Sequence, residues 1–104
     1  MIYKFDQFTL DTESLELKQD GEPIEVEPQV FSLLACLIEN ADRVVSKDEL
    51  IEMVWDGRIV SDGTLNTRIN SVRRAVGDDG KAQAVIKTFP RRGFRFVAEL
   101  NGGV

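Results

Sequence analysis

The pattern of apolar and polar positions divides the chain into a strand-rich start, a helical middle and a strand-rich end. Over the first 27 residues, apolar side chains alternate with polar ones, at Phe5, Phe8 and Leu10, then Leu15 and Leu17, then Ile24 and Val26. A period of two is typical of strands with one buried face. Asp20-Gly21 is a strong signal for a tight hairpin turn. This part of the sequence therefore predicts a small sheet that needs a partner layer.

Three segments with helical spacing of apolar residues follow, over 28–40, from Ser46 to Asp56, and over 63–76. Pro28 suits the first helical position. Ser46 and Glu49 have the spacing of a capping box, and either Ser61 or Asp62 can cap the third helix. Gly77 follows that helix, where a left-handed residue is common.

The last segment alternates again, over 85–89 and 94–97, around the turn Pro90-Arg91-Arg92-Gly93. This pattern predicts a hairpin over 85–97 with two arginines at its tip. The whole pattern indicates an α+β fold in one domain over residues 1–100, with residues 101–104 as a tail or linker stub.

The composition of the chain argues against an enzyme or a metal site. The chain has 104 residues, one cysteine and no histidine, so the commonest general base and metal ligand is missing. We expect no enzyme activity, no metal and no cofactor, and we expect Cys36 to be a buried apolar residue. The start of the chain lacks a signal-peptide pattern, no apolar run approaches the roughly 20 residues of a membrane span, and these features favour the cytoplasm.

Charge is divided unevenly along the chain. Residues 1–62 hold 15 acidic and 5 basic residues, a net of −10, whereas residues 63–104 hold 3 acidic and 8 basic residues, a net of +5. A segregated basic region in an acidic chain is typical of a nucleic-acid-binding surface.

The predicted third helix carries this charge on one face. Opposite its apolar stripe lie the side chains that we predict to read bases in the major groove: Thr67, Asn70, Ser71 and Arg74. Flanking them are the predicted phosphate contacts Asn66, Arg68 and Arg73. Arg91 and Arg92 at the hairpin tip are predicted to enter a minor groove. The alternatives are a solvated helix face, or a protein-interaction module that contacts its partner through the acidic sheet.

The order of strands, three helices and a hairpin resembles the OmpR/PhoB-type winged helix-turn-helix domain. The resemblance covers residues 3–98 and is carried by EPQVFSLL at 27–34, RVVSKDEL at 43–50, VW at 54–55, INSVRR at 69–74 and KTFPRRGFRF at 87–96. It implies a bacterial transcription regulator that binds double-stranded DNA, with the third helix in the major groove and the hairpin, the wing, at the minor groove.

The resemblance has further implications for the control of the protein, its partners and its base preference. The position of the domain at the start of the chain resembles the CadC/ToxR-like regulators, so control by a preceding phospho-acceptor domain is not implied. The family's connection between the second and third helices can contact RNA polymerase, which here assigns that role to Arg58, Ile59 and Val60; packing of Ile59 or Val60 in the core is the alternative. Relatives often bind tandem half-sites, which makes a homodimer on DNA a further expectation. Many relatives carry arginines where this helix has Asn70 and Ser71, so their base preferences are not carried over.

Overall fold

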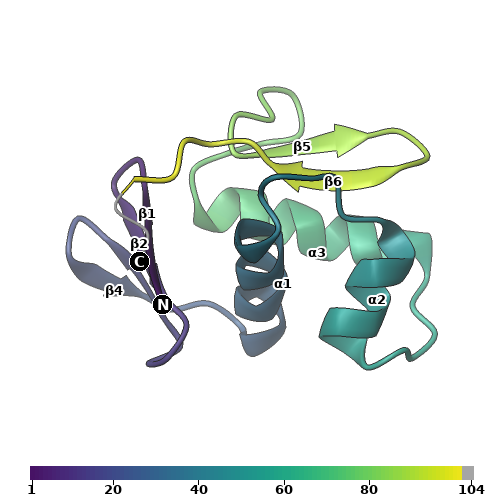
Figure 1. The fold of residues 1–104 in the computed structure, drawn as a ribbon, viewed down its shortest axis with the longest axis horizontal. Coiled ribbons are helices and arrows are strands. Elements are labelled where there is room, and N and C mark those ends of the chain that lie inside the picture. Colours follow the sequence, from purple (N-terminus) through teal and green to yellow (C-terminus); the bar gives the residue numbers. More distant parts are fainter. Residues whose placement is uncertain (102–104) are drawn as a thin grey trace.

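The computed structural model describes residues 1–101 and shows a sheet, three helices and a hairpin, in that order along the chain (Figure 1). The sheet comprises β1 (Ile2–Phe5), β2 (Phe8–Asp11), β3 (Glu16–Gln19) and β4 (Glu22–Ile24). The helices are α1 (Pro28–Glu39), α2 (Lys47–Trp55) and α3 (Asp62–Ala75), and the hairpin pairs β5 (Ile86–Phe89) with β6 (Gly93–Phe96). The predicted winged helix-turn-helix architecture is confirmed, and the ends of the helices and of the hairpin strands differ from the prediction by one residue. In the sheet, Phe5 was grouped with Phe8 and Leu10, but a turn at residues 6–7 separates β1 from β2, and Val26 lies beyond the end of β4.

The four strands form an antiparallel sheet in sequence order. Its β3–β4 turn contains Asp20 and Gly21, both with positive φ (52° and 81°), as a two-residue hairpin turn requires. Leu15 was predicted to share a strand with Leu17, and this is wrong: Leu15 lies in the β2–β3 turn with φ 57° and is 69% exposed. Period-two spacing cannot distinguish a strand residue from an apolar residue in the adjoining turn.

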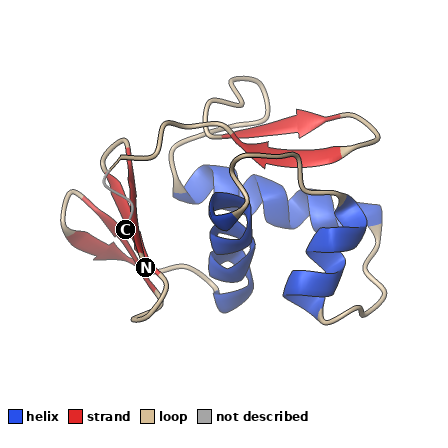
Figure 2. Cartoon of the chain, in the orientation of Figure 1, coloured by secondary structure: helices blue, strands red, loops and turns tan. Residues whose placement is uncertain are grey.

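Helix α1 is the centre of the molecule (Figure 2). Eight of its residues are buried, including Leu33, Leu34 and Leu37, and the inner face of the sheet joins them through Phe5, Phe8, Leu10 and Leu17. Because α1 is apolar on nearly all sides, it can pack against the sheet, α2, α3 and the hairpin together. Cys36 is buried in this helix, as predicted.

The two following helices begin at side-chain caps. In α2 the capping box is formed in both directions, since Glu49 N–H donates to Ser46 Oγ and Ser46 N–H donates to Glu49 Oε1. In α3 the cap is Ser61, whose Oγ accepts from Thr64 N–H. Asp56 closes α2 in the left-handed conformation, and Gly77 follows α3 with φ 72°.

The hairpin is fixed against the start of α2. Val45 pairs with Phe94 through two backbone hydrogen bonds, of 2.7 and 3.0 Å. Gly93 approaches so closely that an added Cβ would lie 2.0 Å from Val45 O. This contact places the hairpin turn next to the first turn of α2.

The end of the chain differs from the prediction. Asn101, predicted to begin a tail, instead donates its N–H to Lys4 O (2.7 Å) and bridges β1. The remaining predicted tail, residues 102–104, lies outside the described residues. Over the described part of the chain, no helix has the length and apolar character needed to cross a membrane.

Candidate nucleic-acid interface

The outer face of α3 carries most of the predicted base-reading residues. Thr67, Asn70 and Arg74 are exposed, Asn66 is exposed beside them, and Ser71 is half-buried. The opposite side of the helix buries Leu65, Ile69 and Val72. Residues 63–75 contain no carboxylate, so this face presents only neutral and positively charged polar groups.

The two hydroxyl groups on this face are tied to the helix backbone. Thr67 Oγ1 donates to Gly63 O (2.8 Å), and Ser71 Oγ donates to Thr67 O (3.1 Å). Each hydroxyl has used its single proton, so it presents lone pairs to the outside. In this arrangement both side chains can accept hydrogen bonds from base amino groups.

Arg73 does not take the role predicted for it. Its side chain is 5% exposed, and its guanidinium donates to Ile86 O (3.2 and 3.0 Å), to Thr88 Oγ1 (2.8 Å) and to Asn70 Oδ1 (3.2 Å). Burial also lowers the pKa of this guanidinium, although it remains charged. The predicted phosphate contact at Arg73 is therefore corrected: the arginine joins α3 to the wing.

Asp78 supports the same junction. Its carboxylate accepts from the backbone N–H groups of Ala84 (2.8 Å), Val85 (3.0 Å) and Ile86 (3.1 Å). Burial by itself would raise the pKa of Asp78, but these three N–H donors, together with the backbone N–H of Asp79, hold the pKa below its ordinary value. The outer edge of β5 is thus closed by side chains, with Gln83 Oε1 accepting from Thr88 N–H (2.9 Å).

Two more arginines of the basic half are engaged within the protein. Arg68 Nε donates to Gln29 Oε1 (2.9 Å), and Arg68 Nη1 lies 3.7 Å from Glu27 Oε2, which draws this side chain toward the start of α1. Arg95 Nε donates to Ala41 O (3.0 Å). The basic side chains of residues 63–101 that remain exposed are Arg74, Lys81, Lys87, Arg91 and Arg92.

A groove of about 540 Å³ separates the wing from the first turns of α2 and α3. Its apolar surface comes from Leu65, Phe89 and Phe94. Three basic side chains, Lys47, Arg91 and Arg92, and two carboxylates, Asp48 and Asp62, also line it. Lys47 pairs with Asp62 across the groove. Arg91 and Arg92 are exposed at the wing tip, and Arg91 adopts a left-handed conformation with φ 65°. The sequence analysis missed Lys47, because only the fold brings the start of α2 next to the wing.

The connection between α2 and α3 places its three predicted polymerase-contact residues differently. Ile59 is fully accessible and Arg58 is exposed, whereas Val60 is half-buried and packs against the core. Of the two alternatives weighed for this segment, core packing holds for Val60, and Ile59 is free on the surface.

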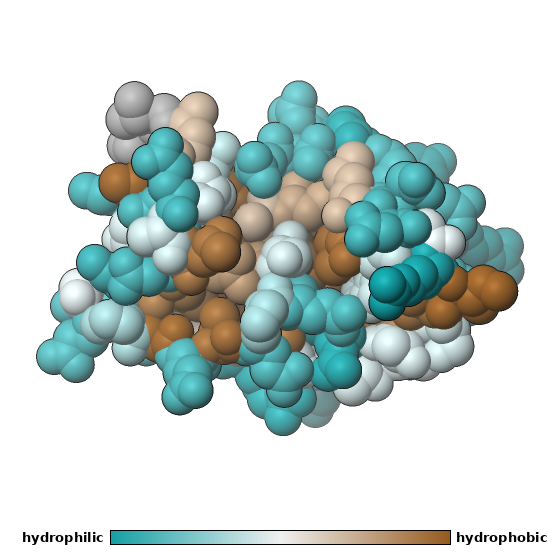
Figure 3. Space-filling model, turned by 90° about the horizontal axis from the view of Figure 1, so that it is seen from below, coloured by the Kyte–Doolittle hydropathy of each residue, from teal (hydrophilic) through white to brown (hydrophobic). Residues whose placement is uncertain are grey.

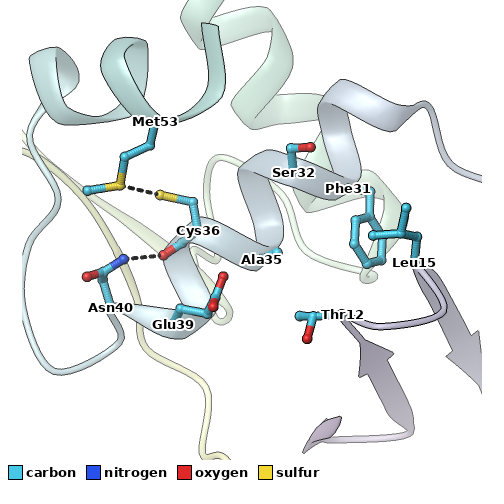
Figure 4. A pocket seen from close by; sticks show the side chains of 9 residues that line it. All are labelled: Thr12, Leu15, Phe31, Ser32, Ala35, Cys36, Glu39, Asn40 and Met53. Atoms are coloured by element: carbon cyan, nitrogen blue, oxygen red, sulfur yellow. Dashed lines mark hydrogen bonds between the residues drawn. The ribbon is translucent and has the colours of Figure 1, made fainter. Parts of the chain in front are cut away.

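A second hollow, of about 590 Å³, lies between the β2–β3 turn, α1 and α2 (Figure 4). Its lining mixes apolar side chains, among them Leu15, Phe31 and Met53, with the polar Thr12, Ser32 and Asn40, and its one charged residue is the acidic Glu39. Cys36 Sγ donates to Met53 Sδ (3.2 Å), and burial raises the pKa of the Cys36 thiol. Seen from below, apolar surface gathers beside the sheet within a mostly hydrophilic surround (Figure 3). A hollow with this lining is unsuited to a polyanion.

The fold and the exposed basic face define a winged helix-turn-helix DNA-binding domain. The family model described as "Transcriptional regulatory protein, C terminal" matches residues 21–96, more than half of the chain. The chain therefore belongs to this family, the OmpR/PhoB-type DNA-binding domains, whose function is sequence-specific DNA binding in transcription regulation.

Relatives and solved structures agree with this assignment. The chain is 29% identical over 86 residues to the transcriptional activator CadC of Escherichia coli, covering 82% of this chain and 17% of that protein. It is 30% identical over 100 residues to the cholera toxin transcriptional activator of Vibrio cholerae, covering 91% of this chain and 34% of that protein. The chain thus spans a minor part of these relatives. The E. coli CpxR DNA-binding domain superimposes with a TM-score of 0.79 at 26% identity, covering 92% of this chain and 95% of that chain.

Proposed function

We propose that this domain binds double-stranded DNA sequence-specifically, with α3 in the major groove and the wing tip at an adjacent minor groove, and that it regulates transcription in this way. The observation that carries the proposal is the outer face of α3, which is free of carboxylates in a chain of net charge −5. Neutral polar side chains in the centre suit base edges, while Arg74 at the end of the face and the two arginines on the wing suit phosphates and the minor groove.

The roles of individual residues follow from their exposure. Thr67, Asn70 and Ser71 face outward with hydrogen-bonding groups and are proposed to read bases. Arg74 is exposed at the end of the same face and is proposed to reach a base or a neighbouring phosphate. Asn66 and Lys47 border the groove between α3 and the wing. We propose that they contact the sugar-phosphate backbone of the DNA strand that enters this groove.

The fold supports this docking. The chain shares its fold with the Klebsiella pneumoniae RstA DNA-binding domain, solved in complex with its RstA box, at a TM-score of 0.79 and 21% identity over 91% of this chain and 95% of that chain. A helix with one apolar and one polar face beside a hairpin is the shape that such complexes require.

Selection of bound sequences from a random DNA pool, followed by gel shifts at two salt concentrations, tests the proposal. We expect enrichment of a defined motif and an affinity that falls steeply with salt. Asn70→Ala should relax the motif at one position at a cost of about 1–3 kcal/mol, whereas Arg74→Ala, if it removes a phosphate contact, should weaken all sequences equally. Binding without any enriched motif would contradict sequence-specific readout.

Three finer points belong to the same proposal. Exposed Ile59 and Arg58 are available for a contact with RNA polymerase, since they project from the connection before α3. Tandem half-sites would bring two copies together on DNA as a homodimer. We also propose that the domain acts in the cytoplasm, since the relatives that it matches are transcription activators of bacteria.

A further inference from the structure

Arg73 contacts Asn70 as well as the wing, and this contact has a consequence for base readout. Asn70 is the exposed side chain near the middle of the outer face of α3, three residues before Arg73 and therefore on the same side of the helix. Arg73 Nη1 donates to Asn70 Oδ1 at 3.2 Å. Of the residues proposed to read bases, Asn70 is the one that this buried arginine touches.

The chemistry of the pair determines which end of the Asn70 amide faces outward. A guanidinium has donors and no acceptor, so the Asn70 atom beside it must be the oxygen. The NH₂ group of Asn70 then lies on the side away from Arg73. In the absence of such a neighbour, an exposed asparagine can turn over and present either its donor or its acceptor.

The guanidinium itself is held in place. Nε and Nη2 donate to Ile86 O, and Nη2 also donates to Thr88 Oγ1, so the plane of the group is set by strand β5. Asp78 holds the adjoining Ile86 N–H. The orientation of the Asn70 amide is therefore fixed by strand β5 of the wing, through Arg73, as well as by α3.

We infer that Arg73 is a positioning residue for base readout: it holds the Asn70 oxygen inward, so that Asn70 meets the major groove as a hydrogen-bond donor and favours guanine. This inference rests on the proposed function, in which α3 enters the major groove. Guanine offers two acceptors, N7 and O6, whereas cytosine offers a donor. An asparagine with both amide atoms free would instead pair with adenine through N6 and N7.

The test first locates the base that Asn70 reads, as the motif position that Asn70→Ala relaxes. Dissociation constants are then measured for the four bases at that position, with wild type, Arg73→Lys, Asn70→Asp and the double variant Arg73→Lys/Asn70→Ala. We expect wild type to favour guanine over cytosine by about tenfold, which corresponds to one lost hydrogen bond to a base. Arg73→Lys keeps the charge but loses the planar fork, and should flatten the preference at this position.

Two variants separate positioning from stability. Asn70→Asp leaves Arg73 in place and presents acceptors alone, so the preference should move to cytosine.

Val72→Ala removes buried volume next to Arg73 without touching Asn70, and should lower stability while keeping the guanine preference. In the double variant, the profile at this position should be no flatter than in Asn70→Ala, because both changes act on one contact.

The outcomes that overturn the inference differ from those that overturn the proposed function. If Arg73→Lys keeps the wild-type preference, if its effect adds to that of Asn70→Ala, or if wild type favours adenine at this position, Arg73 does not position Asn70 as stated. The same holds if Asn70→Ala relaxes no position of a motif that wild type does select. A wild-type domain that selects no motif at all contradicts the proposed function instead.

Discussion

At the scale of single residues, two buried charges hold the wing on α3. Arg73 and Asp78 are the charged residues buried within residues 1–101, and they bind the C=O and the N–H of the same residue, Ile86. A buried charge is costly unless its hydrogen bonds are made, and here they are. The junction therefore orients the wing without leaving buried polar atoms unsatisfied over the described residues.

Asp78→Asn should destabilise the domain by about 2–4 kcal/mol, because one amide oxygen cannot serve the three N–H donors that the carboxylate accepts from. Since folding lowers the pKa of Asp78, its contribution is complete above the unfolded-state pKa and is lost as the pH falls from about 5 toward 2. Urea unfolding at several pH values should therefore show that the free energy of unfolding falls less steeply with acid in the variant than in wild type.

Asp79→Asn is the matched control for Asp78, since Asp79 is exposed and accepts from the N–H groups of Lys81 and Ala82. It should have the smaller effect on stability. Identical acid dependence in wild type and Asp78→Asn would contradict the assigned role.

Gly93→Ala should cost at least about 3 kcal/mol, because the new Cβ would lie 2.0 Å from Val45 O and the residue has φ 146°. Gly77→Ala is the control: it has a positive φ of 72° but open space around it, so it should cost about 1–2 kcal/mol. Both values can be read from denaturant unfolding. Equal losses in the two variants would mean that the close approach of the wing to Val45 adds nothing.

At the scale of elements, the wing is a two-stranded hairpin, and such hairpins are marginal when isolated. Here β6 pairs with Val45 on one side, and side chains from α3 and the following loop close the edge of β5 on the other. The body of the wing is therefore held between α2 and α3, while its tip projects with Arg91 and Arg92 exposed. Rigid strands with an exposed tip suit insertion into a groove.

Replacing both Arg91 and Arg92 by Ala should leave the unfolding midpoint nearly unchanged, because both side chains are exposed. Affinity for DNA should fall, and the slope of log affinity against log salt should shrink by about one to two units. Lys4→Ala/Lys18→Ala removes the same charge from the N-terminal sheet and is the matched control; its slope should stay near that of wild type. If the wing variant kept the wild-type affinity and salt slope, the wing tip would not be part of the DNA interface.

At the scale of the whole molecule, the fold separates the acidic sheet from the basic wing tip. The wing tip projects at one end, and the N-terminal sheet stands at the other (Figure 1). The segment that includes the sheet, residues 1–62, carries a net charge of −10. Like charges repel over about 8–10 Å at physiological salt, so we expect the sheet to lie away from the DNA.

Reversing the charge of Glu16 or Glu25 to Lys should therefore raise nonspecific affinity only slightly and leave the selected motif unchanged. The measurement is the same salt-dependent gel shift, combined with crosslinking to DNA bases. Crosslinks from residues 1–27 to bases would contradict the orientation of the sheet and the docking of α3 that goes with it.

Much of this fold could be predicted from the sequence, because its elements depend on local chemistry. The capping box at Ser46, the hairpin turn at Asp20-Gly21 and the left-handed stop at Gly77 each follow from side chains within a few residues. The acid-free face of α3 also follows from the helical period alone. Leu15 shows the limit, since its spacing fitted a strand and the β2–β3 turn exposed it.

The order of elements, their caps and the division of charge were thus determined by the sequence, through interactions between near neighbours. Which basic side chains stay free was decided by the tertiary structure. Arg68, Arg73 and Arg95 match Arg74 in charge and chemistry, but their partners Gln29, Ile86 and Ala41 are 39, 13 and 54 residues away. A helical wheel places a side chain on a face, and only packing brings a distant carbonyl or amide close enough to bind it.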